Sequence, residues 1–262
     1  MIHARFAELT EQSLQYERLL VPLEAFAATL AQLAQDGVKG CNVTVPFKLD
    51  AFEAATTLTD RAQLARAVNT LRLDGGIVHA DNTDGVGLVN DIQNNAGVAL
   101  AGRDVLLIGA GGAGAGALGP LLAAGPRRLV LVNRTRAKAD ALAASHQSHP
   151  SMQALLQKTE LLTHDLQGLQ GNFDVIINAS ASSLAGAGVP VPASVLKPGA
   201  LACDMMYGPA AAGFMAWAQD HGATPRDGLG MLVEQAAEAF ELWRKVRPPS
   251  AQVLQEMRAQ FG

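Results

Sequence analysis

The chain has 262 residues, of which 49% are apolar and 17% charged, so it can bury a large core and is not of disordered composition. Its net charge of −4 and isoelectric point near 5.8 argue against a nucleic-acid partner. No apolar run approaches the ~18 residues of a membrane span and no signal peptide is recognisable, which predicts a protein without a membrane partner. The two cysteines, Cys41 and Cys203, lie far apart and read as buried thiols in a reducing cytoplasm.

Strand and helix patterns alternate along the first part of the chain. Residues 16–21 read as a strand, and Pro22 then opens an amphipathic helix that Gly37 closes. Residues 40–45 alternate β-branched and polar side chains, which predicts a strand with one buried face that Pro46 ends.

A hairpin and a connecting helix follow. Residues 69–73 and 77–80 flank the turn signal Asp74-Gly75-Gly76, which predicts a β-hairpin. Residues 85–95 read as a helix leading into the centre of the chain.

The centre of the chain repeats a β-α unit. The predicted strands are residues 104–108, 128–132, 173–178 and 200–204, and the predicted helices run to about residue 124 and over residues 135–144. This alternation predicts parallel strands with right-handed crossovers. Residues 145–151, with His146 and His149, read as a solvated loop rather than a metal site, and the chain is again helical from residue 229.

The loop after the first central strand has the spacing Gly109-x-Gly111-x-x-Gly114. Between a predicted strand and a predicted helix, this spacing favours a dinucleotide site over a ligand-free glycine turn. Glycine lets the backbone approach a pyrophosphate, and the N–H groups at the helix start hold its charge. The predicted cofactor contacts here are Gly109, Ala110, Gly111, Gly112, Ala113 and Gly114.

The end of the second central strand indicates which dinucleotide binds. An NAD site would place an acid about 20 residues after the glycines, but none is present here. Asn133 can bind the ribose, while Arg134, Arg136 and Lys138, with the Thr135 hydroxyl, can bind a phosphate. The pattern therefore favours NADP over NAD, and the alternative is a solvated basic turn.

Ordered motifs over most of the chain resemble those of shikimate dehydrogenases. Besides the glycine loop, they are Asn42-Val43-Thr44-Val45-Pro46-Phe47-Lys48, Val68-Asn69-Thr70, Asn82-Thr83-Asp84-Gly85, Asn133-Arg134-Thr135, Asp204-Met205-Met206-Tyr207-Gly208 and Asp227-Gly228-Leu229-Gly230-Met231-Leu232-Val233-Glu234-Gln235-Ala236. The resemblance implies an α/β fold with a substrate domain over residues 1–84. It also implies a doubly wound Rossmann NADP-binding domain over residues 85–227, and C-terminal helices over residues 228–262 that pack on the substrate domain.

The same resemblance implies NADPH-dependent reduction of 3-dehydroshikimate to shikimate, in aromatic amino-acid biosynthesis. It makes Lys48 and Asp84 the catalytic pair. The implied substrate-binding residues are Thr44, Asn69, Tyr207 and Gln235, and Met205 and Gly228 are expected near the nicotinamide. Chemically, a ketone that receives hydride becomes an alkoxide and needs a nearby cation or proton donor. An ordinary Lys48–Asp84 salt bridge is the alternative.

The front of the sequence departs from the family pattern. Members usually begin with a strand and a Ser-x-Ser-Pro segment whose serines bind the substrate carboxylate, whereas this sequence starts at Met1-Ile2-His3, inside the following helix. We expect Met1 to be an internal methionine, or the chain to be a fragment, with neighbouring strand groups unpaired and weaker carboxylate binding.

Two rival interpretations remain open from the sequence. A quinate/shikimate dehydrogenase that uses NAD is the nearest enzyme. A non-catalytic ligand sensor or an inactive fragment belongs to another class, and the presence of both Lys48 and Asp84 disfavours the sensor. The sequence leaves monomer and homodimer equally open.

Overall fold

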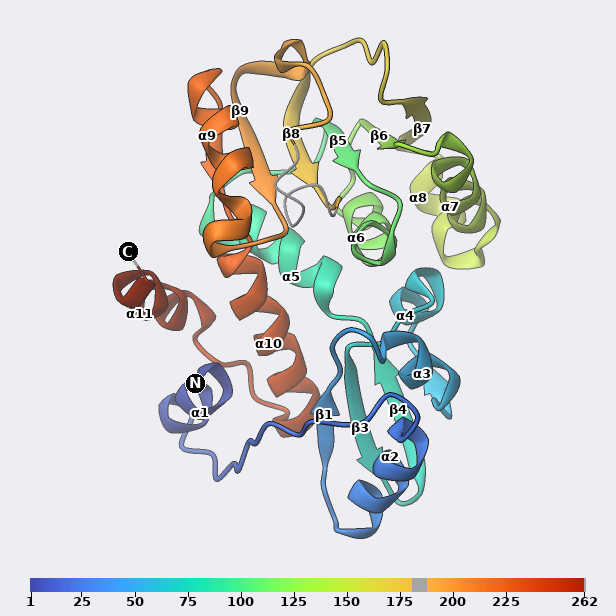
Figure 1. Cartoon of the computed structure of the whole chain (residues 1–262), viewed down its shortest axis with the longest axis vertical. Helices are drawn as coiled ribbons and strands as arrows, with labels where there is room; N and C mark the ends of the chain where they lie inside the picture. Colours follow the sequence, from blue (N-terminus) through green and yellow to red (C-terminus); the bar gives the residue numbers. More distant parts are fainter. Residues whose placement is uncertain (181–187, 262) are drawn as a thin grey trace.

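The computed structural model describes residues 1–180 and 188–261 as a mixed α/β protein with two sheets (Figure 1). A four-stranded sheet has the order β1-β3-β4-β2, and a six-stranded sheet has the order β10-β9-β8-β5-β6-β7. Helices α5 and α10 run between the two sheets in Figure 1 and connect them. Among the described residues, no helix is both long enough and apolar enough to span a membrane.

The four-stranded sheet is mostly antiparallel. Its strands are β1 (Gly40–Asn42), β2 (Thr57–Leu58), β3 (Thr70–Asp74) and β4 (Ile77–Asp81), and its helices are α2 (Phe26–Gln35), α3 (Lys48–Glu53) and α4 (Asp60–Ala65). The predicted hairpin is confirmed, since β3 and β4 pair antiparallel. Gly75 and Gly76 have φ values of +58° and +86°, the left-handed pair that a two-residue hairpin turn requires.

The prediction for residues 16–21 is wrong, because this segment forms no strand. Leu20 is 95% exposed there, and extended residues become a strand only where a neighbouring strand supplies hydrogen bonds. The next helix begins at Phe26 rather than at Pro22, because residues 22–25 form a turn in which the Ala25 N–H donates to the Pro22 carbonyl at 3.0 Å.

The strand predicted over residues 40–45 is also shorter than expected. It ends at Asn42, and the Phe47 N–H then donates to the Thr44 carbonyl at 2.9 Å in a tight turn. Lys48 is therefore the first residue of helix α3 and does not lie at the end of a strand.

The six-stranded sheet is parallel throughout its described pairings. Its strands are β5 (Asp104–Ile108), β6 (Arg128–Asn133), β7 (Glu160–Asp165), β8 (Phe173–Asn178), β9 (Leu196–Asp204) and β10 (Thr224–Arg226). Its helices are α6 (Gly112–Ala123), α7 (Arg136–Ser148), α8 (Gln153–Leu156) and α9 (Ala212–Asp220), with 3-10 turns at Pro150–Met152, Ala193–Val195 and Gly208–Ala211.

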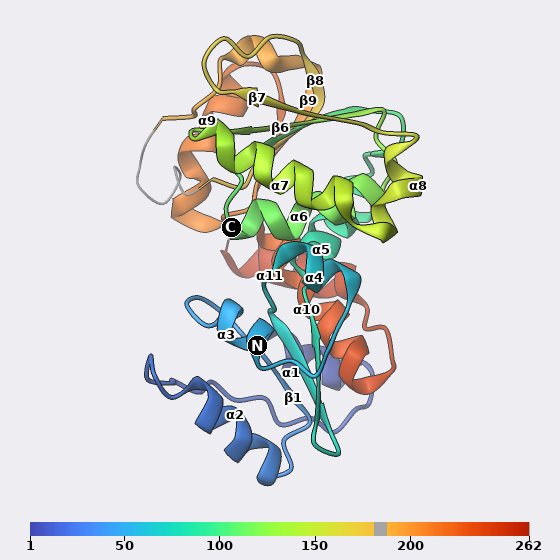
Figure 2. The ribbon, with the colours of Figure 1, turned by 90° about the vertical axis from the view of Figure 1, so that its right-hand side faces the viewer.

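Helices cover both faces of this sheet, which confirms the predicted doubly wound fold. Along β5, Val105 and Leu107 pack in one core with helices α5, α6 and α7, whereas Leu106 and Ile108 pack in the opposite core with α9. Successive side chains of a strand point to opposite faces, so a strand buried on both faces is apolar throughout. Figure 2 shows α6 and α7 on one side of the sheet.

One prediction for the central part needs correction, and two strands there were not predicted. Residues 145–148 are not a loop but the last turn of α7, where His146 is fully buried against α6, with Gly119 close to its ring. Strands β7 and β10 were not predicted, because β7 is a half-exposed edge strand without an apolar pattern and β10 has only three residues.

The remaining helices come from both ends and the middle of the chain. They are α1 (Ile2–Leu9), α5 (Asp84–Asn90), which continues as a π-helical turn (Asp91–Asn95), α10 (Leu229–Arg244) and α11 (Ser250–Phe261). A third apolar core joins α1, α10 and α11, so segments from the two ends of the sequence lie side by side.

Candidate active site

A lysine–aspartate pair lies where the two sheets approach each other. Lys48 begins α3 and Asp84 begins α5, and the Lys48 Nζ donates to the Asp84 Oδ2 at 2.6 Å. The two side chains are 29% and 14% exposed, so the pair is partly dry but reachable from solvent. Such a pair offers a proton donor and a carboxylate acceptor within one small volume.

One amide side chain, that of Asn69, holds this pair, and a second amide, that of Gln235, is joined to the first. The Asn69 Nδ2 donates to the Asp84 Oδ1 at 2.8 Å and to the Gln235 Oε1 at 3.1 Å. The Asn69 Oδ1 accepts from the Thr83 backbone N–H at 2.9 Å. The structure therefore brings together four predicted site residues, Lys48, Asn69, Asp84 and Gln235, from segments far apart in the sequence.

Two glycines of α5 explain how these segments meet. A Cβ atom on Gly85 would lie 2.1 Å from the Gly116 carbonyl oxygen of α6, and one on Gly87 would lie 2.7 Å from the Gln235 nitrogen of α10. Both separations are far below van der Waals contact, so a side chain at either position would push the helices apart. Helix α5 thus brings Asp84 close to both α6 and Gln235.

An ion pair below the site anchors the strand that leads into α5. Asp81 ends β4, accepts from the Arg61 Nε at 2.7 Å and also accepts from the Thr59 hydroxyl at 2.6 Å. Burial alone would raise the pKa of the Asp81 carboxyl, but the hydrogen bonds and charge of Arg61 outweigh it and lower that pKa. The ionised Asp81 carboxylate fixes the strand end three residues before Asp84.

The glycine loop leaves open space at the start of α6. A Cβ on Gly111 or Gly112 would meet no atom within 4 Å. The first N–H groups of a helix have no partner within that helix, so they can bind an anion in this space. The loop therefore fits the pyrophosphate of a dinucleotide.

The base of the loop is closed and tightly packed. Gly109 has a φ of +110° and donates its N–H to the Val132 carbonyl at 2.7 Å. A Cβ on Gly114 would lie 2.0 Å from the Gly109 carbonyl oxygen. The Ala110 N–H donates to the Asn133 Oδ1 at 3.1 Å, which ties the loop to the end of β6.

The three predicted cations after β6 have different surroundings. Arg136 lies 3.5 Å from Asp140 and 3.5 Å from Asp165, so its charge is already paired. Arg134 and Lys138 are exposed, and neither has an ion-pair partner in the part of the chain that the structure describes. Thr135 is exposed beside them. Arg134 and Lys138 are thus the better placed to bind a phosphate.

The remaining predicted residues are Met205 and Gly228, which contact each other, and Thr44 and Tyr207. A Cβ on Gly228 would lie 2.4 Å from the Met205 carbonyl oxygen, so these two residues are in backbone contact. Thr44 and Tyr207 are exposed, Tyr207 at 52%, and within residues 1–180 and 188–261 no hydrogen bond joins either side chain to the Lys48–Asp84 pair.

Sequence reasoning missed part of the site. Thr70 and Thr83 are fully buried and make hydrogen bonds to Asn69, and Asn42 makes one to Thr70. Thr70 follows Asn69 and Thr83 precedes Asp84 in the quoted motifs, and Asn42 begins the motif that ends at Lys48; these positions were the available signal.

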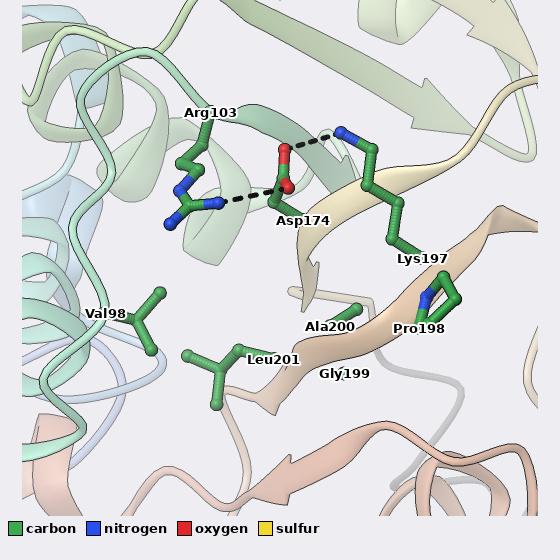
Figure 3. Close-up of a pocket in the computed structure, with 8 residues that line it drawn as sticks. All are labelled: Val98, Arg103, Asp174, Lys197, Pro198, Gly199, Ala200 and Leu201. Atoms are coloured by element: carbon green, nitrogen blue, oxygen red, sulfur yellow. Dashed lines mark hydrogen bonds and ion pairs between the residues drawn. The ribbon is translucent and has the colours of Figure 1, made fainter.

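A pocket of about 190 Å³ lies elsewhere, at the amino ends of the parallel strands (Figure 3). Arg103, Asp174 and Lys197 line it, and Asp174 accepts from Lys197 at 2.8 Å and from Arg103 at 3.5 Å. The glycine loop follows the carboxyl end of β5, at the other edge of the sheet, so this pocket is not the dinucleotide site.

Comparison with known proteins gives matches over most of the chain. Three family descriptions match the chain, namely "Shikimate dehydrogenase substrate binding domain" over residues 1–71, "Shikimate / quinate 5-dehydrogenase" over residues 91–186 and "Shikimate 5'-dehydrogenase C-terminal domain" over residues 228–258. A shikimate dehydrogenase (NADP(+)) of Acidovorax ebreus (strain TPSY) is 67% identical over 258 residues, which are 98% of this chain and 90% of that protein.

Solved structures with the same fold include an Ael1 enzyme from Pseudomonas putida, which is 44% identical with a TM-score of 0.88, covering 97% of this chain and 91% of that one. Shikimate 5-dehydrogenase from Thermus thermophilus, solved in complex with NADP(H) and shikimate, is 28% identical with a TM-score of 0.83, covering 98% and 92%. The chain belongs to the shikimate dehydrogenase family.

Proposed function

We propose that this chain catalyses the reversible reduction of 3-dehydroshikimate to shikimate with NADPH, a step of aromatic amino-acid biosynthesis. The observation that carries the proposal is the Lys48–Asp84 pair, which Asn69 holds and Gln235 supports through Asn69, beside the first turns of α6. Membership of the shikimate dehydrogenase family supports it.

NADPH, when bound, supplies the hydride, and NADP⁺ accepts it in the reverse direction. Residues 109–114 would hold the pyrophosphate and Asn133 the ribose, while Arg134, Thr135 and Lys138 would hold the 2′-phosphate. Met205 and Gly228 would border the nicotinamide.

The lysine and the aspartate of the chain handle the proton. In the reduction direction, the Lys48 ammonium donates a proton to the ketone oxygen as the carbon accepts hydride, which leaves a hydroxyl group. Asp84 keeps the Lys48 nitrogen in place and accepts a hydrogen bond from a substrate hydroxyl. Because Lys48 is 29% exposed, it can regain its proton from water.

Amide and hydroxyl side chains would orient the substrate ring. Asn69, which donates to Asp84, and Gln235, which accepts from Asn69, would bind substrate hydroxyls, and Thr44 and Tyr207 would close the site from either side. A site whose polar groups are matched to hydroxyls rejects analogues that leave those groups unpaired.

The test is the initial rate of NADPH formation by the purified chain with shikimate and NADP⁺. Quinate as substrate and NAD⁺ as cofactor serve as the competing arms. Shikimate with NADP⁺ is expected to give the highest kcat/KM. A higher kcat/KM with quinate and NAD⁺ would favour the quinate/shikimate dehydrogenase, and no turnover of either substrate would refute the proposal.

The same proposal covers the organisation of the chain. Residues 1–84 with 228–262 would form the substrate unit, and residues 85–227 the NADP-binding unit. The free thiols of Cys41 and Cys203 suit a cytoplasmic enzyme. It would act as a monomer or a homodimer, which size-exclusion chromatography with light scattering decides.

A further inference from the structure

A series of hydrogen bonds leads from the Lys48–Asp84 pair to helix α1. Thr70 is 0%, Asn69 3% and His3 6% exposed and Asn42 is partly buried, so the series is largely shielded from solvent. Its links are His3 Nε2 to Asn42 Oδ1 at 3.0 Å, Asn42 Nδ2 to Thr70 Oγ1 at 3.1 Å, Thr70 Oγ1 to Asn69 Oδ1 at 3.0 Å and Asn69 Nδ2 to Asp84 Oδ1 at 2.8 Å.

Backbone groups and the histidine fix the direction of the first links. The Asn42 Nδ2 faces the Asn69 backbone carbonyl at 3.3 Å, which can only accept, so the Asn42 Oδ1 faces His3. His3 Nε2 must then carry the hydrogen. Burial lowers the pKa of His3 to about 4, which keeps the ring neutral at neutral pH and leaves Nδ1 without a hydrogen. Nδ1 is indeed buried without a hydrogen-bond partner among the described residues.

The last links have a fixed direction as well. The Asn69 Oδ1 accepts from the Thr83 backbone N–H, so the Asn69 Nδ2 faces Asp84. The Thr70 hydroxyl has one proton, and because it accepts from Asn42, it gives that proton to the Asn69 Oδ1. Every link thus donates towards the carboxylate, and hydrogen bonds aligned in this way strengthen one another.

The Asn69 Nδ2 has more acceptors within reach than hydrogens to give. Its two hydrogens can go to Asp84 Oδ1, to Gln235 Oε1 or to Thr83 Oγ1, at 2.8, 3.1 and 3.0 Å. Which two acceptors it serves depends on how the amide plane is turned. The Thr70 hydroxyl and the Thr83 backbone N–H both donate to the Asn69 Oδ1, at 3.0 and 2.9 Å, so both donors act on that angle.

We propose that Thr70 is a positioning residue for hydride transfer, because its hydroxyl turns the Asn69 amide so that the amide holds the Asp84 carboxylate against Lys48. The inference rests on the proposed function. Without the hydroxyl, Asn69 retains only its contacts with Thr83 on the oxygen side, and its amide turns away from Asp84.

The test compares Thr70→Val, which keeps the shape but removes the hydroxyl, with Thr70→Ser, which keeps the hydroxyl. Thr159→Val is the matched control, because Thr159 is 3% exposed and donates to the Pro126 carbonyl at 2.7 Å, within the six-stranded sheet region. We expect Thr70→Val to lower kcat for shikimate about tenfold with an unchanged KM for NADP⁺. Thr70→Ser should restore kcat to within about threefold of the wild type, and the control should leave kcat unchanged.

A crystal structure of the Thr70→Val protein is the second readout, with Thr70→Ala in its place if the valine variant does not fold. The Asn69 Nδ2 is expected to lie beyond hydrogen-bond distance of the Asp84 Oδ1, instead of 2.8 Å from it. If the wild-type chain turns over no shikimate, the proposed function fails. The distance between the Asn69 Nδ2 and the Asp84 Oδ1 in the variant then decides the positioning role by itself. An unchanged kcat, an equal loss in the Thr159→Val control or an unmoved Asn69 amide would overturn the inference.

Discussion

Replacing Lys48 by methionine separates its chemical role from its structural role. Methionine has a similar length but no ammonium group. The Asp84 carboxylate loses its partner at 2.6 Å but keeps the Asn69 donor at 2.8 Å, so it is not left without a hydrogen bond. Since both side chains retain some exposure, the free energy of unfolding should fall by only about 1 kcal/mol.

The loss in rate should be much larger than the loss in stability. Removal of a general acid–base group typically costs about 10²-fold or more in kcat, which corresponds to about 2.7 kcal/mol or more in the activation barrier. If Lys48 served only as a salt-bridge partner, the folded Lys48→Met enzyme would keep a kcat close to that of the wild type.

The assay measures kcat with saturating shikimate and NADP⁺, together with the free energy of unfolding in urea. Asp84→Asn and the double variant complete a mutant cycle. Because the two residues act as a unit, the double variant is expected to be about as slow as Lys48→Met alone. A Lys48→Met enzyme with near-wild-type kcat, or losses that simply add in the double variant, would refute the reasoning.

Three further predictions concern other parts of the structure. Arg134→Ala should raise the KM for NADP⁺ about tenfold and leave the KM for NAD⁺ unchanged. Because the charge of Arg136 is already paired, Arg136→Ala should change the KM for NADP⁺ less, and steady-state kinetics measure both. His3 has a pKa of about 6.5 in the unfolded chain but of about 4 in the folded chain. The free energy of unfolding should therefore fall by about 3 kcal/mol as the pH falls from 6.5 to 4. His3→Gln should remove this part of the pH dependence, measured by urea unfolding. Gly85→Ala should destabilise the protein by about 3 kcal/mol, since its Cβ would lie 2.1 Å from the Gly116 oxygen; an unchanged melting temperature contradicts this packing.

The parallel sheet could be predicted well from sequence because burial on both faces leaves a strong pattern. Residues 104–108 are apolar in four of five positions, and the structure has β5 over the same residues. Residues 16–21 carry a comparable apolar and aromatic content but no ladder partner, and pairing is a property of the neighbouring strand rather than of the segment. The segment around His146 is polar and so predicts a loop, whereas the structure has the last turn of α7 there, with His146 on the buried face of the helix.

The candidate site was only partly readable from sequence. Ordered motifs named Lys48, Asp84, Asn69 and Gln235, and the structure places these four in one hydrogen-bonded group. The orientation of the Asn69 amide could not be predicted, because it depends on hydrogen-bond direction through Thr70. The pairing of Arg136 with Asp165, on the later strand β7, was likewise invisible in the local pattern.

The meeting of Asn69 with Gln235 has a consequence for how the protein assembles. The two residues are 166 positions apart, so the group around Asp84 stays incomplete until α10 has been synthesised and has docked. The strands β5 to β10, by contrast, follow one another along the chain and need no segment from either end to pair. Closing so long a loop is entropically unfavourable and slow compared with local contacts. Competence for chemistry should therefore be the last property that a nascent or refolding chain acquires, well after its central sheet has formed.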